Sequence, residues 1–154
     1  YTVYTHWSNI MKLEDIRKMA EKDSVLDYTE LDIESLKLPQ LHNKYLNIYH
    51  DEKLLLSKFT SDLKKGIRIK WEYYTGKLDE DTLKELGLEP FPLKILKTDI
   101  DKYLESDDEL IVLSHRVDYQ KEKIGYLEST IKELNTRHWK IRNAIEWKKF
   151  VNGV

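Results

Sequence analysis

The residues best suited to a chemical task lie in one basic and aromatic stretch, Leu63–Gly76. It sets four cations beside three aromatic rings, namely Lys64, Lys65, Arg68 and Lys70 with Trp71, Tyr73 and Tyr74. Cations neutralise phosphates and rings stack on bases, so together they are the parts of a sequence-tolerant site for a single nucleic-acid strand. The alternative interpretation is an ordinary amphipathic helix end with a solvated basic face.

Helical geometry divides this stretch between two faces. On an ideal helix Lys64, Arg68 and Trp71 fall within about 60° of one another, whereas Lys70 lies on roughly the opposite side. One strand could touch both faces if the helix end frays after Gly66, or different protomers could present different faces. The candidate DNA-binding residues are Lys64, Lys65, Arg68, Lys70, Trp71, Tyr73 and Lys77.

The net charge of −2 conceals a strong segregation of charge along the 154 residues. Residues 40–78 carry 8 basic and 4 acidic side chains, and residues 110–154 carry 9 and 5. Between them, residues 79–109 carry 4 basic and 11 acidic side chains. Two basic regions therefore flank an acidic one. A binding site for a polyanion is compatible with this distribution, although the net charge of the whole chain gives no sign of it.

The sequence offers no assembled catalytic or cofactor site. Cysteine is absent, so a disulfide, a thiol nucleophile and a thiolate metal site are excluded. The five histidines lack the spacing of a zinc site, and no glycine-rich phosphate loop exists. No apolar run reaches the roughly 18 residues of a membrane span. We therefore expect a soluble, intracellular, non-enzymatic protein without a metal or cofactor.

Hydrophobic periodicity predicts an all-α fold with two long helices. Short helices are expected over Met11–Lys22, around residues 31–36 and over Asp79–Leu86, and a long helix should start at Pro39 and end at Tyr74. Residues 93–96 suit a short strand or an extended linker. A capping box formed by Ser106 and Glu109 should open the second long helix, which runs to about Phe150.

The second long helix carries the strongest structural signal, an apolar seam with a mean spacing of 3.5 residues. A helix of about 40 residues is about 60 Å long and needs either the Pro39–Tyr74 helix as its partner or copies of itself. We expect it to be the main self-association element. The candidate oligomerisation residues are Val117, Ile124, Leu127, Ile131, Leu134, His138, Ile141 and Ile145.

The chain also resembles a known family, the UvsY recombination mediators of T-even-like phages. The opening Met11-Lys-Leu-Glu-Asp15 is similar to the start of those proteins. The family's basic motif, Lys-Ala-Arg-Leu followed by Asp-Tyr-Tyr-Ser-Gly, matches Arg68-Ile-Lys70-Trp-Glu-Tyr-Tyr-Thr-Gly76 position by position. The two basic residues are exchanged, and Trp71 replaces an aliphatic residue. Charge is kept, while hydrogen-bond geometry changes because arginine and lysine are not equivalent.

The resemblance implies a mainly helical protein that forms a ring of six or seven subunits. Such a protein binds single-stranded DNA, loosens the single-strand-binding protein and helps load the phage recombinase in the cytoplasm of the infected bacterium. By motif match, Arg68 and Lys70 would be the phosphate contacts. The rival hypothesis is a structural coiled-coil scaffold or interaction protein that touches no nucleic acid.

These expectations divide the chain into four functional segments. Residues 1–10 read as an extension or a remnant with no assigned function. Residues 11–89 form the helical single-stranded-DNA-binding region, residues 90–105 a connector, and residues 106–154 the C-terminal oligomerisation helix.

Overall fold

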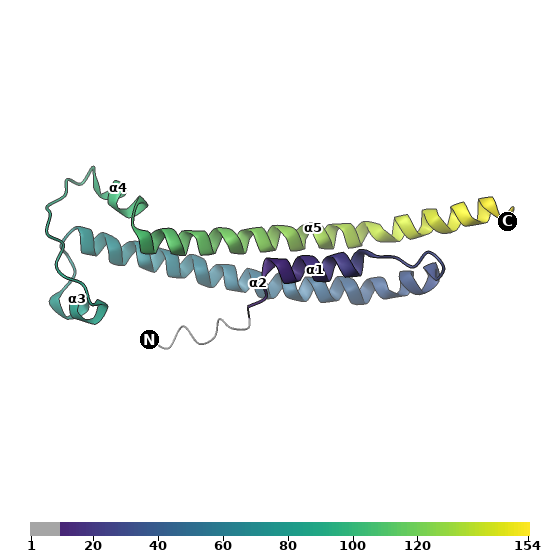
Figure 1. The fold of residues 1–154 in the computed structure, drawn as a ribbon, viewed down its shortest axis with the longest axis horizontal. Helices are drawn as coiled ribbons and strands as arrows, with labels where there is room; N and C mark the ends of the chain where they lie inside the picture. Colours follow the sequence, from purple (N-terminus) through teal and green to yellow (C-terminus); the bar gives the residue numbers. More distant parts are fainter. Residues whose placement is uncertain (1–9) are drawn as a thin grey trace. The chain divides into compact units, whose positions relative to one another are not determined.

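The computed structural model describes residues 10–154 and is all-α over that range, as predicted. The helices are α1 (Leu13–Ser24), α2 (Leu31–Tyr74), α3 (Glu80–Leu86), α4 (Ile100–Glu105) and α5 (Asp108–Val151) (Figure 1). The two long helices, α2 and α5, have 44 residues each. Residues 1–9 of the predicted N-terminal extension lie outside the described part. Residues 93–96 form no strand.

The chain divides into two compact units. Residues up to Lys53 and Glu122–Val154 form the first unit, and Leu54–Lys121 form the second. Because α2 and α5 each contribute to both units, neither residues 11–89 nor residues 106–154 form a compact unit alone. The segment division made from the sequence therefore remains a prediction about function.

The core of the first unit joins α1 to the facing parts of α2 and α5. Ile16, Tyr45 and Leu127 are fully buried there, and Ala20 and Leu134 complete the cluster. These positions follow the predicted helical spacing, which places apolar side chains of each helix on one stripe. The apolar stripes of α1, α2 and α5 therefore face one another in this core.

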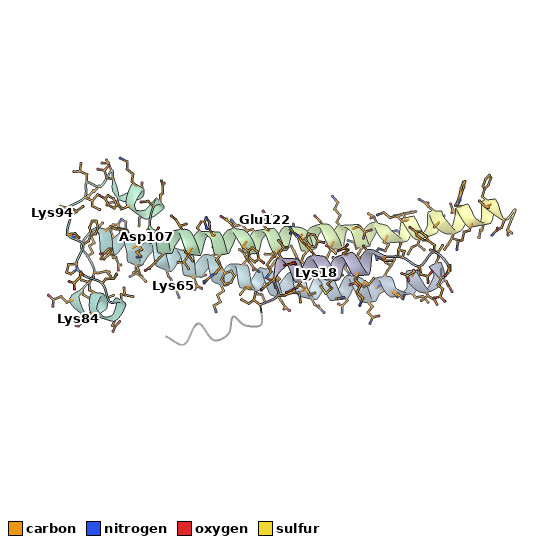
Figure 2. The ribbon with its side chains drawn as sticks, viewed as in Figure 1. Lys18, Lys65, Lys84, Lys94, Asp107 and Glu122 are labelled. Atoms are coloured by element: carbon orange, nitrogen blue, oxygen red, sulfur yellow. The ribbon has the colours of Figure 1, made fainter. Side chains whose placement is uncertain are left out.

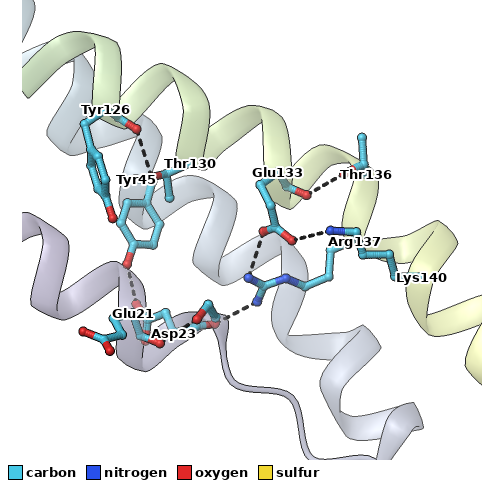
Figure 3. Close-up of polar contacts among 10 residues, drawn as sticks. Glu21, Asp23, Tyr45, Tyr126, Thr130, Glu133, Thr136, Arg137 and Lys140 are labelled. Atoms are coloured by element: carbon cyan, nitrogen blue, oxygen red, sulfur yellow. Dashed lines mark hydrogen bonds and ion pairs between the residues drawn. The ribbon is translucent and has the colours of Figure 1, made fainter. Parts of the chain in front are cut away.

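Polar contacts fasten the end of α1 to the same core (Figure 3). The Tyr45 hydroxyl donates to Asp23 at 2.8 Å, and Lys44 Nζ lies 2.6 Å from the same carboxylate oxygen. The Arg137 guanidinium donates to the Asp23 carbonyl at 2.8 Å and pairs with Glu133 at 3.0 Å. The Tyr45 hydroxyl and both terminal nitrogens of Arg137 thereby have partners, which lets these large side chains enter an apolar interface.

Most of the α5 seam is buried within the chain. Ile124, Leu127, Leu134 and Ile141 are buried in the first unit, Val117 is buried in the second, and Ile131 is half-buried. His138 and Ile145 remain exposed. The sequence left two partners open for this helix, the preceding long helix or copies of itself. Within each unit α5 packs against α2, which is the first of these. Self-association of α5 is therefore not needed to cover the seam.

The start of α2 corrects one prediction. The sequence predicted a short helix near residues 31–36 and a new helix at Pro39, but α2 is continuous and contains Pro39. Proline has no N–H, so the carbonyl four residues earlier, that of Ser35, loses its usual helical partner. Ser35 is exposed, and water can satisfy that carbonyl. The break expected at Pro39 is wrong for this reason.

The start of α5 corrects a second prediction, that of the capping box at Ser106. Asp107, not Ser106, caps the helix, since its carboxylate accepts from the Leu110 N–H at 3.0 Å. The Ser106 hydroxyl instead donates to the Lys102 carbonyl at 2.7 Å and closes α4. The predicted capping box is therefore wrong by one residue. By contrast, α3 agrees with the predicted range Asp79–Leu86, since Asp79 caps its start and a left-handed Gly87 follows its end.

Candidate nucleic-acid interface

The predicted DNA-binding residues lie at the C-terminal end of α2 and just beyond it, in the second unit. Five of them are exposed and form what we call the basic patch: Lys64, Lys65, Arg68, Trp71 and Lys77. Lys70 and Tyr73 are only partly exposed. The helix that carries most of the patch, α2, ends at Tyr74, and Gly76 follows with a φ of 72°, the left-handed conformation typical of the residues just after a helix.

Of the two motif cations, Arg68 is the more accessible to a ligand. Its side chain is 80% exposed, and its one described ion pair joins Nε to the Glu72 carboxylate at 3.1 Å, one helical turn away. An exposed pair of this kind contributes only a few tenths of a kcal/mol, about 0.3–0.5 on a helix. The guanidinium can therefore exchange this partner for a phosphate at little cost.

Lys70 has a different environment. Its side chain is 11% exposed, and Nζ lies 3.3 Å from Asp107 and 3.2 Å from Glu109. Burial alone would lower the pKa of Lys70, but the hydrogen bond to Glu109 and the charges of Asp107 and Glu109 outweigh it and raise that pKa. The structure thus gives Lys70 two carboxylate partners, and a phosphate would have to displace them.

Asp107 links this lysine to the start of α5. Besides capping that helix, its carboxylate accepts from the Tyr74 hydroxyl at 2.7 Å. Burial alone would raise the pKa of Asp107, yet the hydrogen bonds from Tyr74 and the Leu110 N–H, with the charge of Lys70, lower it below its ordinary value. Sequence reasoning missed this group, because the contact joins residues more than 30 positions apart.

An aromatic cluster surrounds Tyr74. The Phe91 ring meets Tyr74 edge-on at 5.0 Å between centroids, and it meets Tyr73 at 5.5 Å. Tyr103 completes the cluster, 5.5 Å from Tyr74. Such edge-to-face pairs stabilise packed rings. Tyr73 is therefore committed to packing on at least one side, which the sequence could not show.

Trp71 remains the exposed ring of the patch. The Lys77 ammonium lies 4.2 Å from its ring centroid, close enough for a cation–π contact. This contact places a cation next to an exposed aromatic surface, the combination that a single-strand site needs. Arg68 and Lys70 do not share a face, as helical spacing indicated.

The described residues 10–154 contain no group of three or more histidine, aspartate or glutamate side chains that could hold a metal ion. None of the helices in the same range is long and apolar enough to cross a membrane. The arrangement is thus one of surface charge and exposed rings, set on a helix end.

The fold defines an all-α protein over the described residues, and comparison with known proteins gives its family. Residues 19–154 match the model of the family described as "Recombination, repair and ssDNA binding protein UvsY". The chain belongs to the UvsY family. It is similar to the "Recombination protein uvsY" of Enterobacteria phage T4, at 22% identity over 143 residues, covering 93% of this chain and 99% of that protein.

Solved structures share the fold. Two crystal structures of the bacteriophage T4 recombination mediator protein UvsY, in lattice types IV and II, superpose with TM-scores of 0.80 and 0.81. Both are 20% identical to this chain. They cover 91% and 93% of it, and 99% of each solved chain. The resemblance noted in the sequence is thereby confirmed at the level of family and fold.

Proposed function

We propose that this chain is a recombination mediator that binds single-stranded DNA as a ring-like homo-oligomer. It would help load a phage recombinase onto DNA coated by the phage single-strand-binding protein, in the cytoplasm of the infected host, without itself catalysing a reaction. The observation that carries the DNA-binding part is the basic patch, where Arg68 and Lys77 flank the exposed Trp71. The mediator part rests on family membership and on the likeness to the T4 recombination mediator protein UvsY.

The patch supports weak, salt-sensitive binding by each protomer. Lys64, Lys65 and Lys77 are exposed lysines, and the exposed Arg68 pairs with Glu72 on its own helix. Each phosphate neutralised on a single strand contributes about −0.7 to the slope of log K against log salt. Several copies in one assembly would multiply this weak affinity through effective concentration, so a strand could pass between protein coats without nucleotide hydrolysis.

A hexameric or heptameric ring needs a surface outside the buried seam. Near the C-terminal end of α5 large apolar side chains are exposed, among them Trp147, Phe150 and Val151. Ile145, one of the predicted oligomerisation residues, is exposed close to them in sequence. Exposed apolar groups at this density are typical of interaction sites. We propose that self-association uses this part of α5, while the buried seam residues hold the protomer together.

The test is binding of a fluorescent oligothymidylate by the intact protein over a series of salt concentrations. We expect saturable binding whose affinity falls steeply with salt, and weaker binding of a duplex of equal length. A native mass measurement with and without the strand gives the subunit number. The rival scaffold function predicts the same oligomer with no salt-dependent DNA binding, so this outcome would overturn the proposal.

The loading step needs its own measurement. Recombinase assembly on an oligonucleotide pre-coated with single-strand-binding protein should be accelerated by this chain and slowed again by loss of the basic patch. If the chain binds DNA but does not change the rate of recombinase assembly, it is a single-strand-binding protein and the proposed mediator role is wrong.

A further inference from the structure

A recess of about 890 Å³ lies beside the basic patch, within the second unit. One wall comes from the end of α2 and the residues after it, including Trp71 and Lys77. The other comes from the segment between α3 and α4, which contributes Phe91, Lys94 and Lys97. Its volume falls in the range of about 300–1,000 Å³ that small-molecule sites occupy.

The lining combines cations with aromatic rings. Lys77, Lys94 and Lys97 line the recess together with one acidic residue, Asp101, so the lining is positive overall. Lys94 and Lys97 are both exposed, and in the described part of the chain no ion pair engages either ammonium. Figure 2 shows Lys94 on the connecting segment and Lys65 on α2, both in this unit. The cations here are thus available to an anionic ligand.

The two walls are held together by packing rather than by the cations. Phe91 contacts Tyr73 and Tyr74, and the Tyr74 hydroxyl donates to Asp107. These contacts fix the start of the connecting segment against α2 while leaving the lysines in solvent. A site whose walls are preorganised loses less conformational entropy when a ligand binds.

We propose that this recess is a nucleotide subsite that extends the strand-binding surface of the basic patch. One base of a single strand would enter against the Trp71 ring, and Lys94 and Lys97 would neutralise the adjoining phosphates. The subsite rests on the proposed function, since it shares Trp71 and Lys77 with the basic patch. Rings favour a base over an acidic peptide, because a peptide carboxylate gains from the lysines but not from a stacking surface.

The sequence alone points away from this assignment. Lys94 and Lys97 lie in residues 79–109, where acidic side chains outnumber basic ones by 11 to 4. The fold sets these two lysines beside the end of α2, in a recess where Asp101 is the one acidic residue of the lining.

The first experiment measures salt-dependent binding of fluorescent oligothymidylate to the full chain. Lys94→Ala with Lys97→Ala should lower the affinity and flatten the salt slope by about 1.4, which corresponds to two phosphates. The matched control is Lys84→Ala with Lys121→Ala, two exposed lysines of the same unit outside the recess, which should leave the slope unchanged. Circular dichroism verifies that both variants fold.

A second experiment tests entry of the base. An abasic strand of the same length keeps the phosphates, so any preference for oligothymidylate reports stacking. Trp71→Leu should reduce that preference by roughly 5- to 150-fold, the range of one base–ring stack, while leaving affinity for the abasic strand almost unchanged. An equal loss for both strands would mean that Trp71 does not stack a base, and would overturn the subsite.

A parallel variant separates failure of the subsite from failure of the proposed function. If Arg68→Ala weakens binding while Lys94→Ala with Lys97→Ala does not, the subsite is wrong and the basic patch stands. If the unmodified protein does not bind the strand at all, both proposals fall. If polyglutamate competes as strongly as oligothymidylate at equal charge, the recess takes acidic chains and the nucleotide assignment is overturned.

Discussion

The ammonium of Lys123 lies 2.7 Å from the carboxylate of Glu52, and both side chains are buried in the first unit. Glu52 interrupts an apolar repeat of α2 with spacings of four and three residues, formed by Leu41, Tyr45, Ile48, Leu55 and Phe59. Lys123 precedes the seam residue Ile124. Each of the two charged side chains is buried beside an oppositely charged partner, which accounts for their presence in an apolar interface. A buried pair of this kind contributes little net stability, but removing one member leaves a costly charge behind.

We expect Lys123→Met to lower the free energy of unfolding by about 3–5 kcal/mol, because it leaves Glu52 buried without this cation. The double variant Lys123→Met with Glu52→Leu should recover much of that loss. Urea denaturation followed by circular dichroism measures both. A double variant no more stable than Lys123→Met alone would show that the cost comes from packing rather than from charge.

The two motif cations should give different phenotypes. Arg68→Ala should flatten the salt slope of single-strand binding by about 0.7 and leave stability unchanged, because its side chain is exposed. Lys70→Ala should lower the free energy of unfolding by about 1–3 kcal/mol, because Asp107 loses a charged partner. Filter binding and urea denaturation separate the two effects. Identical behaviour of both variants in DNA binding, with no change in stability, would mean that Lys70 leaves its carboxylate partners to contact the strand.

Acid should weaken the second unit through Asp107. Its folded-state pKa is lower than its unfolded value near 3.8, so its stabilising contribution is complete above that value and is lost as pH falls through the folded pKa. Asp107→Asn keeps a side-chain acceptor for the helix cap but cannot titrate. We therefore expect the variant to lose less stability than the natural protein between pH 5 and pH 3, as measured by urea denaturation. A parallel decline of both proteins would assign the acid sensitivity to other carboxylates, such as Asp23 and Glu133, whose pKa values are also lowered.

Assembly should depend on the exposed end of α5 rather than on its buried seam. Trp147→Asp with Phe150→Asp should dissociate the oligomer while keeping the protomer helical, because both side chains are exposed. Leu134→Asp should instead unfold the first unit, since it buries a carboxylate in the core. Sedimentation equilibrium with circular dichroism distinguishes these results.

If affinity comes from many subunits, the Trp147 and Phe150 variant should also bind oligothymidylate more weakly, although no residue of the basic patch has changed. An intact oligomer would place the interface elsewhere on the chain. Dissociation with undiminished DNA affinity would show that one protomer is sufficient and that the mass-action mechanism is wrong.

Local chemistry in the sequence determined the helices and several of their ends. The seam spacing predicted buried Leu127 and Leu134, and Asp79 and Gly87 marked the two ends of α3. These predictions succeed because helical periodicity and capping depend on residues within one or two turns. The same local reasoning identified the basic and aromatic stretch that contains Arg68 and Trp71.

Tertiary structure decided what each of these side chains faces. Lys70 has the same charge as Arg68, yet it is turned toward Asp107, a residue 37 positions away, and only the packing of α2 beside the start of α5 within the second unit creates that pair. Packing of the segment between α3 and α4 against the end of α2 brings Lys94 and Lys97 into the same recess as Trp71. Contacts between distant segments depend on how whole helices pack, and a one-dimensional pattern does not contain that information. The sequence by itself therefore determined which segments are helical and where charge gathers, and the fold decided which charges remain available to a ligand.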